Sequence, residues 1–214
     1  MLAARRAHAM PCGMTIRALF PTLLHQSRIE DTAFLAELAH SCQLLPVEDR
    51  AGRTWSKANG YRGYTSYASL NDLPRRDPVF ADLVKRLAKP VAGFAEACAF
   101  DLAGRKPKLD SLWVNVLRPG GAHSGHLHPH SIISGTLYVA IPPGAGAIRF
   151  EDPRLPLYMA APPRREDAEE GARTFVTVTP EPGTVLLWES WLRHEVLPSN
   201  AREDRVSVSF NYRW

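Results

Sequence analysis

Four of the eight histidines stand close together in this 214-residue chain, at His123, His126, His128 and His130, and His194 follows in a later tryptophan-rich segment. Imidazole is the commonest side-chain metal ligand because it is neutral near physiological pH and offers one lone pair per ring. Side chains two residues apart on a strand point to the same face, so His126 and His128 are expected to be adjacent. With His194 on a neighbouring strand, they predict a three-histidine metal site.

His130 is a competing ligand, because it repeats the same spacing from His128. We prefer His126, since Pro129 is expected to bend the strand toward a turn. His123 and His130 are then loop residues, or lie beside the metal or the substrate. A zinc site built on cysteine is not supported, because the chain has no CxxC pair.

Length and composition indicate one globular domain over residues 1–214. Hydrophobic residues make up 45% of the chain and charged residues 22%, and no apolar run reaches the roughly 20 residues of a membrane span. Three widely spaced cysteines do not imply a disulfide framework, so a reducing cytoplasm is expected.

The net charge of +4 and the pI of 9.1 come mostly from scattered arginines. Nucleic-acid binding would need a contiguous basic face, so we expect no nucleic-acid partner and no membrane partner. A homodimer is compatible with the sequence but is not derivable from it. Residues 1–14 are expected to be a disordered tail, with Met14 as an alternative start.

Two helical patterns precede the histidines and define a helical support region over residues 15–104. Asp31 can cap a first helix, and Asp77 with Pro78 can start a long amphipathic second helix. Pro90 is expected to kink or split that second helix. Residues 48–74 show no periodicity and are interpreted as loop with a short strand.

From residue 105 onward the pattern changes to alternation with a period of two, which predicts a jelly-roll core over 105–214. The fold class is therefore mainly β, a double-stranded β-helix packed against N-terminal α-helices. One face of each strand is polar, and we expect it to line an internal cavity. The charged, proline-rich segment 152–173 is interpreted as a flap or lid. Strands are expected at 112–118, 124–130, 134–141, 146–151, 174–179, 183–189, 192–197 and 205–213.

Arg205 and Ser207 alternate with apolar residues on the last predicted strand, which places both on its polar face. An arginine inside a cavity needs an anion, because burying its charge costs several kcal/mol. A protein carboxylate such as Glu151, Asp152 or Asp110 is one candidate. The other is a dicarboxylate ligand held by the guanidinium and the Ser207 hydroxyl, which would be a 2-oxo acid if it also reached the metal.

In this combination the chain resembles the iron(II)- and 2-oxoglutarate-dependent oxygenases, whose fold is a double-stranded β-helix, and more narrowly a bacterial and phage branch of that superfamily. The resemblance covers residues from about 110 to 214, with a weaker echo at residues 19–21. The motifs that carry it are WVN at 113–115, HLHP at 126–129, SGTLY at 134–138, EDPR at 151–154, SWLRH at 190–194 and RVSVSFN at 205–211.

The resemblance implies that iron(II) is bound by the three predicted histidines and that Arg205 and Ser207 bind the distal carboxylate of 2-oxoglutarate. It places Tyr138 as a further donor to that cosubstrate, with Asn115 as an additional contact. The implied reaction consumes O2, releases succinate and CO2, and hydroxylates a small molecule or peptide. The chain departs from the usual two histidines and one carboxylate, because His128 stands where the acid would be. A third neutral ligand leaves the metal more positive.

Two other functions remain open from the sequence. A cupin dioxygenase or isomerase would share Gly120 and the HxH pair, but it expects a glutamate where this chain has Ile132 or Ile133, and it would not need Arg205. A non-catalytic jelly-roll binding module could keep a metal for structure alone. Trp188 and Trp191 could form the floor of the pocket, although core packing is the commoner role of such residues.

Overall fold

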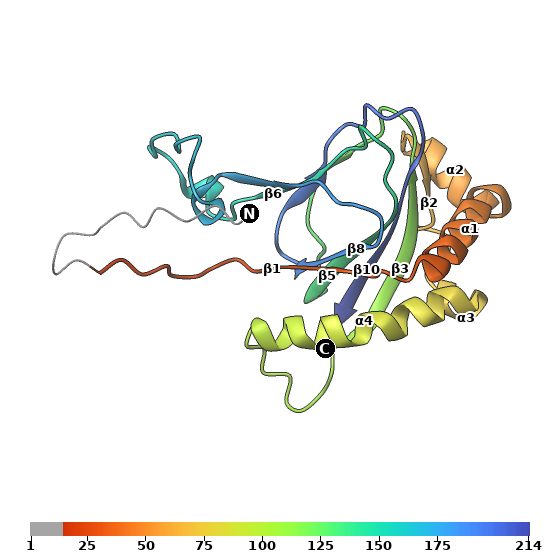
Figure 1. The fold of residues 1–214 in the computed structure, drawn as a ribbon, viewed down its shortest axis with the longest axis horizontal. Helices are drawn as coiled ribbons and strands as arrows, with labels where there is room; N and C mark the ends of the chain where they lie inside the picture. The colour runs from red at the N-terminus through yellow and green to blue at the C-terminus, as the bar shows by residue number, and fades with distance from the viewer. Residues whose placement is uncertain (1–14) are drawn as a thin grey trace.

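The computed structural model describes residues 15–214, so the predicted tail over 1–14 and the alternative start at Met14 lie outside the described residues. The described chain forms two antiparallel β-sheets. One has six strands in the order β1-β8-β5-β10-β3-β2, and the other has four in the order β4-β9-β6-β7. Sequence-distant strands are neighbours in both sheets, as the predicted jelly roll requires (Figure 1).

Each of the eight predicted strand segments contains a strand. The expected segment 124–130 is cut short, because its strand ends at His126 and His130 has a positive φ of 68° in the turn after Pro129. His128 therefore lies just beyond the strand, where its backbone amide donates to the Ser190 carbonyl at 3.0 Å. The strands are β3 (Lys108–Leu117), β4 (His123–His126), β5 (Ile133–Ala140), β6 (Ile148–Glu151), β7 (Phe175–Val178), β8 (Thr184–Glu189), β9 (His194–Val196) and β10 (Arg205–Arg213).

The helices begin where the sequence indicates. Helix α1 (Thr32–Glu48) is capped by Asp31, whose carboxylate accepts the Phe34 amide at 3.0 Å. Helix α4 (Pro78–Ala97) is capped in the same way by Asp77. Of the predicted kink or split at Pro90, the split is wrong, because α4 continues past the proline as one helix whose apolar positions on either side are buried; the kink stays a prediction.

Residues 48–74 are more structured than predicted. The loop interpretation is wrong for α2 (Arg50–Ala58) and α3 (Leu73–Arg76), whereas the short strand is present as β2 (Gly63–Thr65). Helix α2 buries the small residues Gly52 and Ser56, so it lacks the recurring large apolar residues that indicate the two longer helices. Strand β1 (Leu24–Arg28) was also missed, because it joins β8 at the sheet edge through backbone pairing and buries no complete apolar face.

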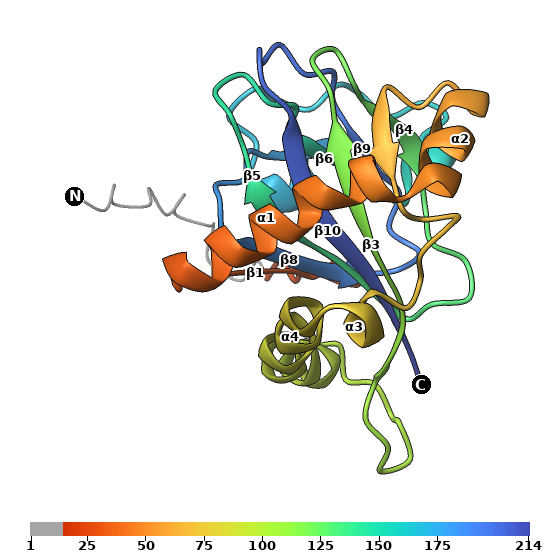
Figure 2. The same ribbon diagram turned by 90° about the vertical axis from the view of Figure 1, so that its right-hand side faces the viewer.

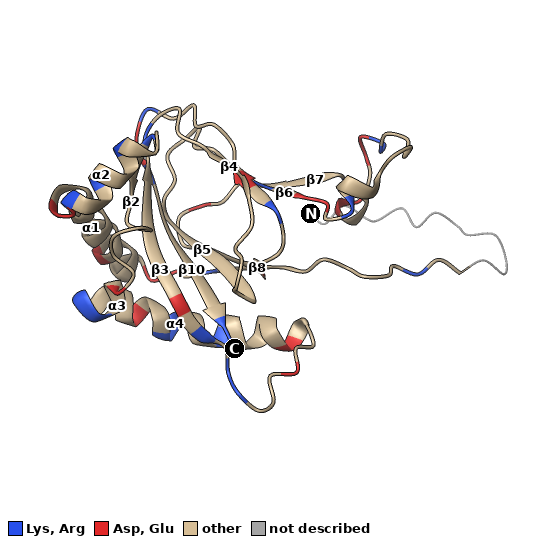
Figure 3. Ribbon diagram, turned by 180° about the vertical axis from the view of Figure 1, so that it is seen from behind, with Lys and Arg blue, Asp and Glu red and all other residues tan. Residues whose placement is uncertain are grey.

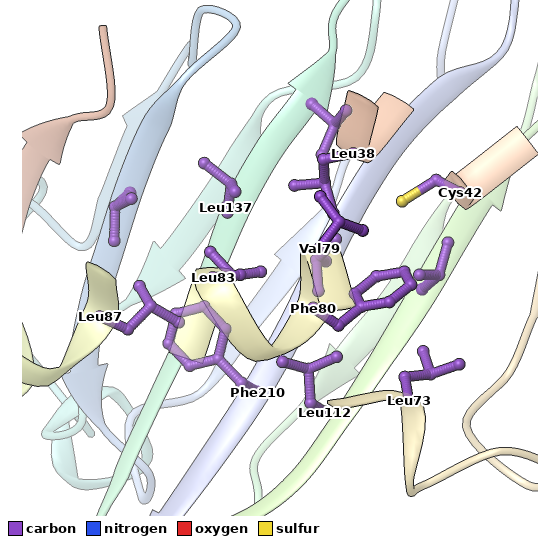
Figure 4. Close-up of a cluster of buried hydrophobic side chains, with 14 of the residues drawn as sticks. Leu38, Cys42, Leu73, Val79, Phe80, Leu83, Leu87, Leu112, Leu137 and Phe210 are labelled. Atoms are coloured by element: carbon purple, nitrogen blue, oxygen red, sulfur yellow. The ribbon is translucent and has the colours of Figure 1, made fainter. Parts of the chain in front are cut away.

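The main hydrophobic core lies between the helices and one face of the six-stranded sheet. Helices α1 and α4 cross in front of that sheet (Figure 2), and their apolar side chains meet those of β3, β5 and β10 (Figure 4). Each fully buried Leu or Phe contributes about 2 kcal/mol of hydrophobic stabilisation. Because the helices cover this face, the polar face of β10 is turned toward the other sheet.

The segment between β6 and β7 carries two short 3-10 helices, η1 (Leu155–Leu157) and η2 (Glu170–Ala172), and projects from the molecule (Figure 1). Its role as a lid remains a prediction. Basic and acidic positions are interspersed along the helices (Figure 3). Among the described residues, no helix is long and apolar enough to cross a membrane.

Candidate metal and cosubstrate site

The structure brings His126, His128 and His194 together in one cluster. Their candidate ligand nitrogens all lie within 4.8 Å of one another. Strands β4 and β9 pair His126 directly with His194, and the centroids of these two rings are 4.4 Å apart. The His128 ring is 5.3 Å from the His126 ring and 5.1 Å from the His194 ring. The three rings are therefore close enough to share one ion.

Hydrogen bonds orient each ring in the cluster. The Nδ1 atom of His126 is 2.8 Å from the Ser124 carbonyl, and that of His194 is 2.9 Å from the Leu192 carbonyl. The Nδ1 atom of His128 is 2.6 Å from Oδ1 of Asn211. Because each of these oxygens accepts, each Nδ1 carries the proton and each Nε2 keeps a free lone pair. Metal-binding histidines are oriented by partners of this kind.

Burial favours the neutral form of His128 and His194. It lowers the pKa of His128, and it lowers the pKa of His194 to about 3, with the neighbouring His126 adding to the effect. Trp188, which is 1% exposed, packs its ring 4.7 Å from that of His194 and supports it from the core. Trp191, in contrast, is 46% exposed, so it does not share this buried position. Neutral imidazoles are the form that binds iron, zinc, copper or nickel.

The two remaining histidines of the 123–130 segment differ in position, and the loop prediction is wrong for His123. His130 is not part of the cluster. His123 begins β4, and its Nε2 atom is 2.7 Å from the hydroxyl of Tyr61. The cluster contains His126 and not His130, and the choice of His126 as a metal ligand stays a prediction.

A cavity of about 700 Å³ opens beside the histidines between the two sheets. All three clustered histidines line it, and so do Arg205 and Ser207. Trp55 of α2 and residues 59–62 of the turn that follows it form part of its wall, whereas no residue of 152–173 does. Among the described residues that line the cavity, none is an aspartate or a glutamate. Any negative charge that balances a metal and the arginine must therefore come from a ligand.

Arg205 is the most unusual side chain in the cavity. It is 1% exposed, yet no carboxylate of the described chain pairs with it. Its Nη1 atom donates to the Ser207 hydroxyl at 3.2 Å, its Cζ atom lies 5.0 Å from the centre of the Tyr138 ring, and its Nε atom has no hydrogen-bond partner among described residues. Burial lowers its pKa, with partial compensation from the nearby tyrosines.

The protein carboxylates considered as partners for Arg205 are engaged elsewhere. Glu151 lies 3.3 Å from Arg193, and Asp152 pairs with Arg154 at 2.8 Å. Asp110 lies 3.4 Å from Arg213. The expectation that one of these acids neutralises Arg205 is therefore wrong, and the buried guanidinium is left to meet an anion from outside the protein.

The sheet register places further donors beside this arginine. Across β3, β10 and β5, Asn115 pairs with Ser207 and Ser207 pairs with Tyr138. The Tyr138 hydroxyl is fully buried beside Arg205, and it makes no hydrogen bond of ordinary geometry with a described residue. Asn115 has its amide oxygen occupied by the Thr65 hydroxyl at 2.8 Å. The guanidinium, Ser207 and Tyr138 thus form a pocket of unsatisfied donors that fits a carboxylate.

A jelly roll whose inner surface combines three converging imidazoles with an unpaired buried arginine is the architecture of a metal-dependent enzyme that binds an organic acid. Residues 111–211 match the family model described as "Putative 2OG-Fe(II) oxygenase". This match indicates an iron(II)- and 2-oxoglutarate-dependent oxygenase, as the sequence resemblance implies. A protein of that family uses iron(II), 2-oxoglutarate and O2, and the three clustered histidines could hold such a metal.

Solved structures share the fold at low sequence identity. A prolyl-4-hydroxylase from Pseudomonas putida is 17% identical with a TM-score of 0.62, over 90% of this chain and 94% of that one. AviO1 from Streptomyces viridochromogenes Tue57 is 13% identical with a TM-score of 0.59, over 90% of each chain. HygX from Streptomyces hygroscopicus, solved with nickel and 2-oxoglutarate, is 17% identical with a TM-score of 0.55, over 90% of this chain and 82% of that one. No curated protein sequence matches the chain.

Proposed function

We propose that the chain hydroxylates a small molecule or a peptide, with His126, His128 and His194 as iron ligands. Arg205, Ser207 and Tyr138 bind the distal carboxylate of 2-oxoglutarate. Iron(II), when bound, supplies the reaction in which O2 and 2-oxoglutarate give succinate, CO2 and one oxygen atom for a C–H bond of the substrate. The protein holds the geometry and keeps bulk water out.

The observation that carries this proposal is the unpaired burial of Arg205. A guanidinium that is 1% exposed without a carboxylate partner is costly in the ligand-free protein, and a ligand carboxylate removes that cost. Bidentate hydrogen bonding suits the planar fork of arginine, and Ser207 and Tyr138 add neutral donors. A 2-oxo acid group at the other end of the same ligand would reach a metal held by the histidines, which line the same cavity.

Asn115 serves a supporting role in this proposal. Its amide oxygen accepts from Thr65, and its amide nitrogen donates to Ser209 at 3.2 Å. These bonds hold β2, β3 and β10 in register beside Ser207. We therefore assign Asn115 to shaping the carboxylate pocket rather than to the principal contact with the ligand.

Oxygen uptake by the iron(II)-loaded protein, measured with and without 2-oxoglutarate, tests this function. Without the substrate that is hydroxylated, we expect slow O2 uptake that depends on 2-oxoglutarate. One mole of succinate should form for each mole of O2 consumed. Uptake that does not depend on 2-oxoglutarate would instead favour a cupin-type enzyme. A protein that binds neither the metal nor 2-oxoglutarate would favour a non-catalytic binding module.

The substrate side of the cavity is aromatic. Tyr67 packs against Trp113 with ring centroids 5.2 Å apart, and Trp113 lies 5.8 Å from the His128 ring. All three line the cavity, and Tyr67 is 58% exposed. This wall extends from the histidines to the surface, and we propose that the substrate lies against it. The cytoplasmic location and the absence of a nucleic-acid partner remain predictions.

A further inference from the structure

Tyr61 contributes a hydroxyl group to the cavity wall that no sequence motif indicated. It lies in the turn between α2 and β2, at the edge of the six-stranded sheet. Its hydroxyl is 2.7 Å from Nε2 of His123, which belongs to the edge strand β4 of the other sheet. Tyr61 therefore connects the two sheets across one side of the cavity.

The hydroxyl proton of Tyr61 is poorly used within the protein. The hydroxyl also donates to Oδ1 of Asn115, but over a long distance of 3.3 Å. That oxygen already accepts a shorter hydrogen bond of 2.8 Å from Thr65. If His123 carries its proton on Nε2, it donates to the Tyr61 oxygen, and the Tyr61 proton is free for a better acceptor.

The position of Asn115 shows where that acceptor would lie. Asn115 pairs with Ser207 across β3 and β10, and the Ser207 hydroxyl accepts from Arg205. The Tyr61 hydroxyl thus approaches the arginine pocket from the β3 side, whereas Tyr138 approaches it from β5. Tyr61 and Arg205 also interact electrostatically. Burial raises the pKa of Tyr61, so its phenol remains a neutral donor.

We propose that Tyr61 is a further cosubstrate-binding residue, whose hydroxyl donates to the distal carboxylate of 2-oxoglutarate opposite Tyr138, and that His123 is the positioning residue that holds this hydroxyl in place. This inference rests on the proposed function. It assigns His123 a role beside the metal ligands rather than among them.

The test is calorimetric titration of Mn²⁺-loaded protein with 2-oxoglutarate and with 2-oxopentanoate, which has a methyl group in place of the distal carboxylate. The variant Tyr61→Phe removes only the hydroxyl, and we expect it to weaken 2-oxoglutarate binding about tenfold. Binding of 2-oxopentanoate and of Mn²⁺ should stay within twofold of the wild type. Loss of a structural contact alone would weaken both acids equally, and that result would overturn the proposal.

Two further variants complete the test. His123→Leu should weaken 2-oxoglutarate binding in the same direction, whereas His123→Gln should restore part of it because the amide can still donate to Tyr61. Tyr158→Phe is the matched control, since it loses a hydroxyl bond of 2.7 Å to Asp152 outside the cavity and should bind both acids as the wild type does.

The outcomes separate this inference from the function on which it rests. Wild-type protein that binds Mn²⁺ but not 2-oxoglutarate would refute the proposed function. Wild-type protein that binds 2-oxoglutarate while Tyr61→Phe binds it with equal affinity would refute only the role of Tyr61.

Discussion

Replacing Arg205 with methionine should change stability and ligand binding in opposite directions. In the ligand-free protein the wild-type guanidinium is buried, and its Nε atom has no partner among the described residues. Arg205→Met keeps most of the side-chain volume and removes the buried charge. Exchanging a poorly compensated buried ion for an apolar side chain is typically neutral or stabilising.

The magnitude follows from the contacts of the arginine. Desolvating an ion costs several kcal/mol, and the Ser207 bond with the Tyr138 ring offsets only part of that cost. We therefore expect the ligand-free variant to gain roughly 1–3 kcal/mol in free energy of unfolding. Losing two charge-assisted hydrogen bonds of about 1.5–3 kcal/mol each should weaken 2-oxoglutarate binding at least 100-fold.

Urea unfolding of Mn²⁺-loaded protein, with and without 2-oxoglutarate, measures both effects. At a 2-oxoglutarate concentration of about 100 times its Kd, the wild type should gain about 2.7 kcal/mol. The variant should gain almost nothing at that concentration. A variant that is less stable without ligand, yet still stabilised by 2-oxoglutarate, would show that Arg205 is a structural residue paired in a way that the cavity geometry does not reveal.

Three further predictions concern the histidines. His194→Ala should abolish stoichiometric iron binding measured by elemental analysis, whereas His130→Ala should retain it; loss of iron in both would contradict the ligand set. Asn211→Ala should weaken metal affinity by roughly 10- to 100-fold in a chelator competition assay, because it removes the shorter of the two contacts that orient the His128 Nδ1 atom, the other being the Ser134 hydroxyl at 2.9 Å; an unchanged affinity would remove the orienting role. Burial and neighbouring charges lower the pKa of both His194 and His123 from 6.5 to about 3, so below pH 6.5 the unfolded state binds more protons than the folded state. The metal-free protein should therefore lose roughly 2–4 kcal/mol of stability between pH 7 and pH 5, and urea unfolding that is flat over this range would refute it.

Local chemistry accounts for the parts of the fold that the sequence predicted. Asp31 and Asp77 cap helices because their carboxylates reach backbone amides a few residues away. The alternation of apolar and polar residues predicts the eight strand segments, because a two-residue period can be recognised without knowledge of the partner strand. The same two-residue period predicts that the histidines of the HxH pair share one face of a strand, and that Arg205 and Ser207 of the RxS pair share another.

Elements whose packing depends on residues distant in the sequence could not be predicted from the sequence. Helix α2 packs through Gly52 and Ser56, which carry no hydrophobic signal, and α4 passes Pro90 as one helix with its apolar face buried on both sides of the proline. Tyr61 reaches the cavity only because the turn before β2 places it across from His123. No residue spacing within one segment encodes such a contact.

The sequence by itself determined the residue types of the site and the faces on which they lie, because strand alternation and capping are short-range effects. Only the tertiary structure decided that His126, His128 and His194 converge, and that Arg205 has no carboxylate partner within residues 15–214. Both facts depend on how β4, β9 and β10 are arranged between two sheets. That arrangement arises from burying the opposite face of the six-stranded sheet under α1 and α4, which is a property of the whole chain.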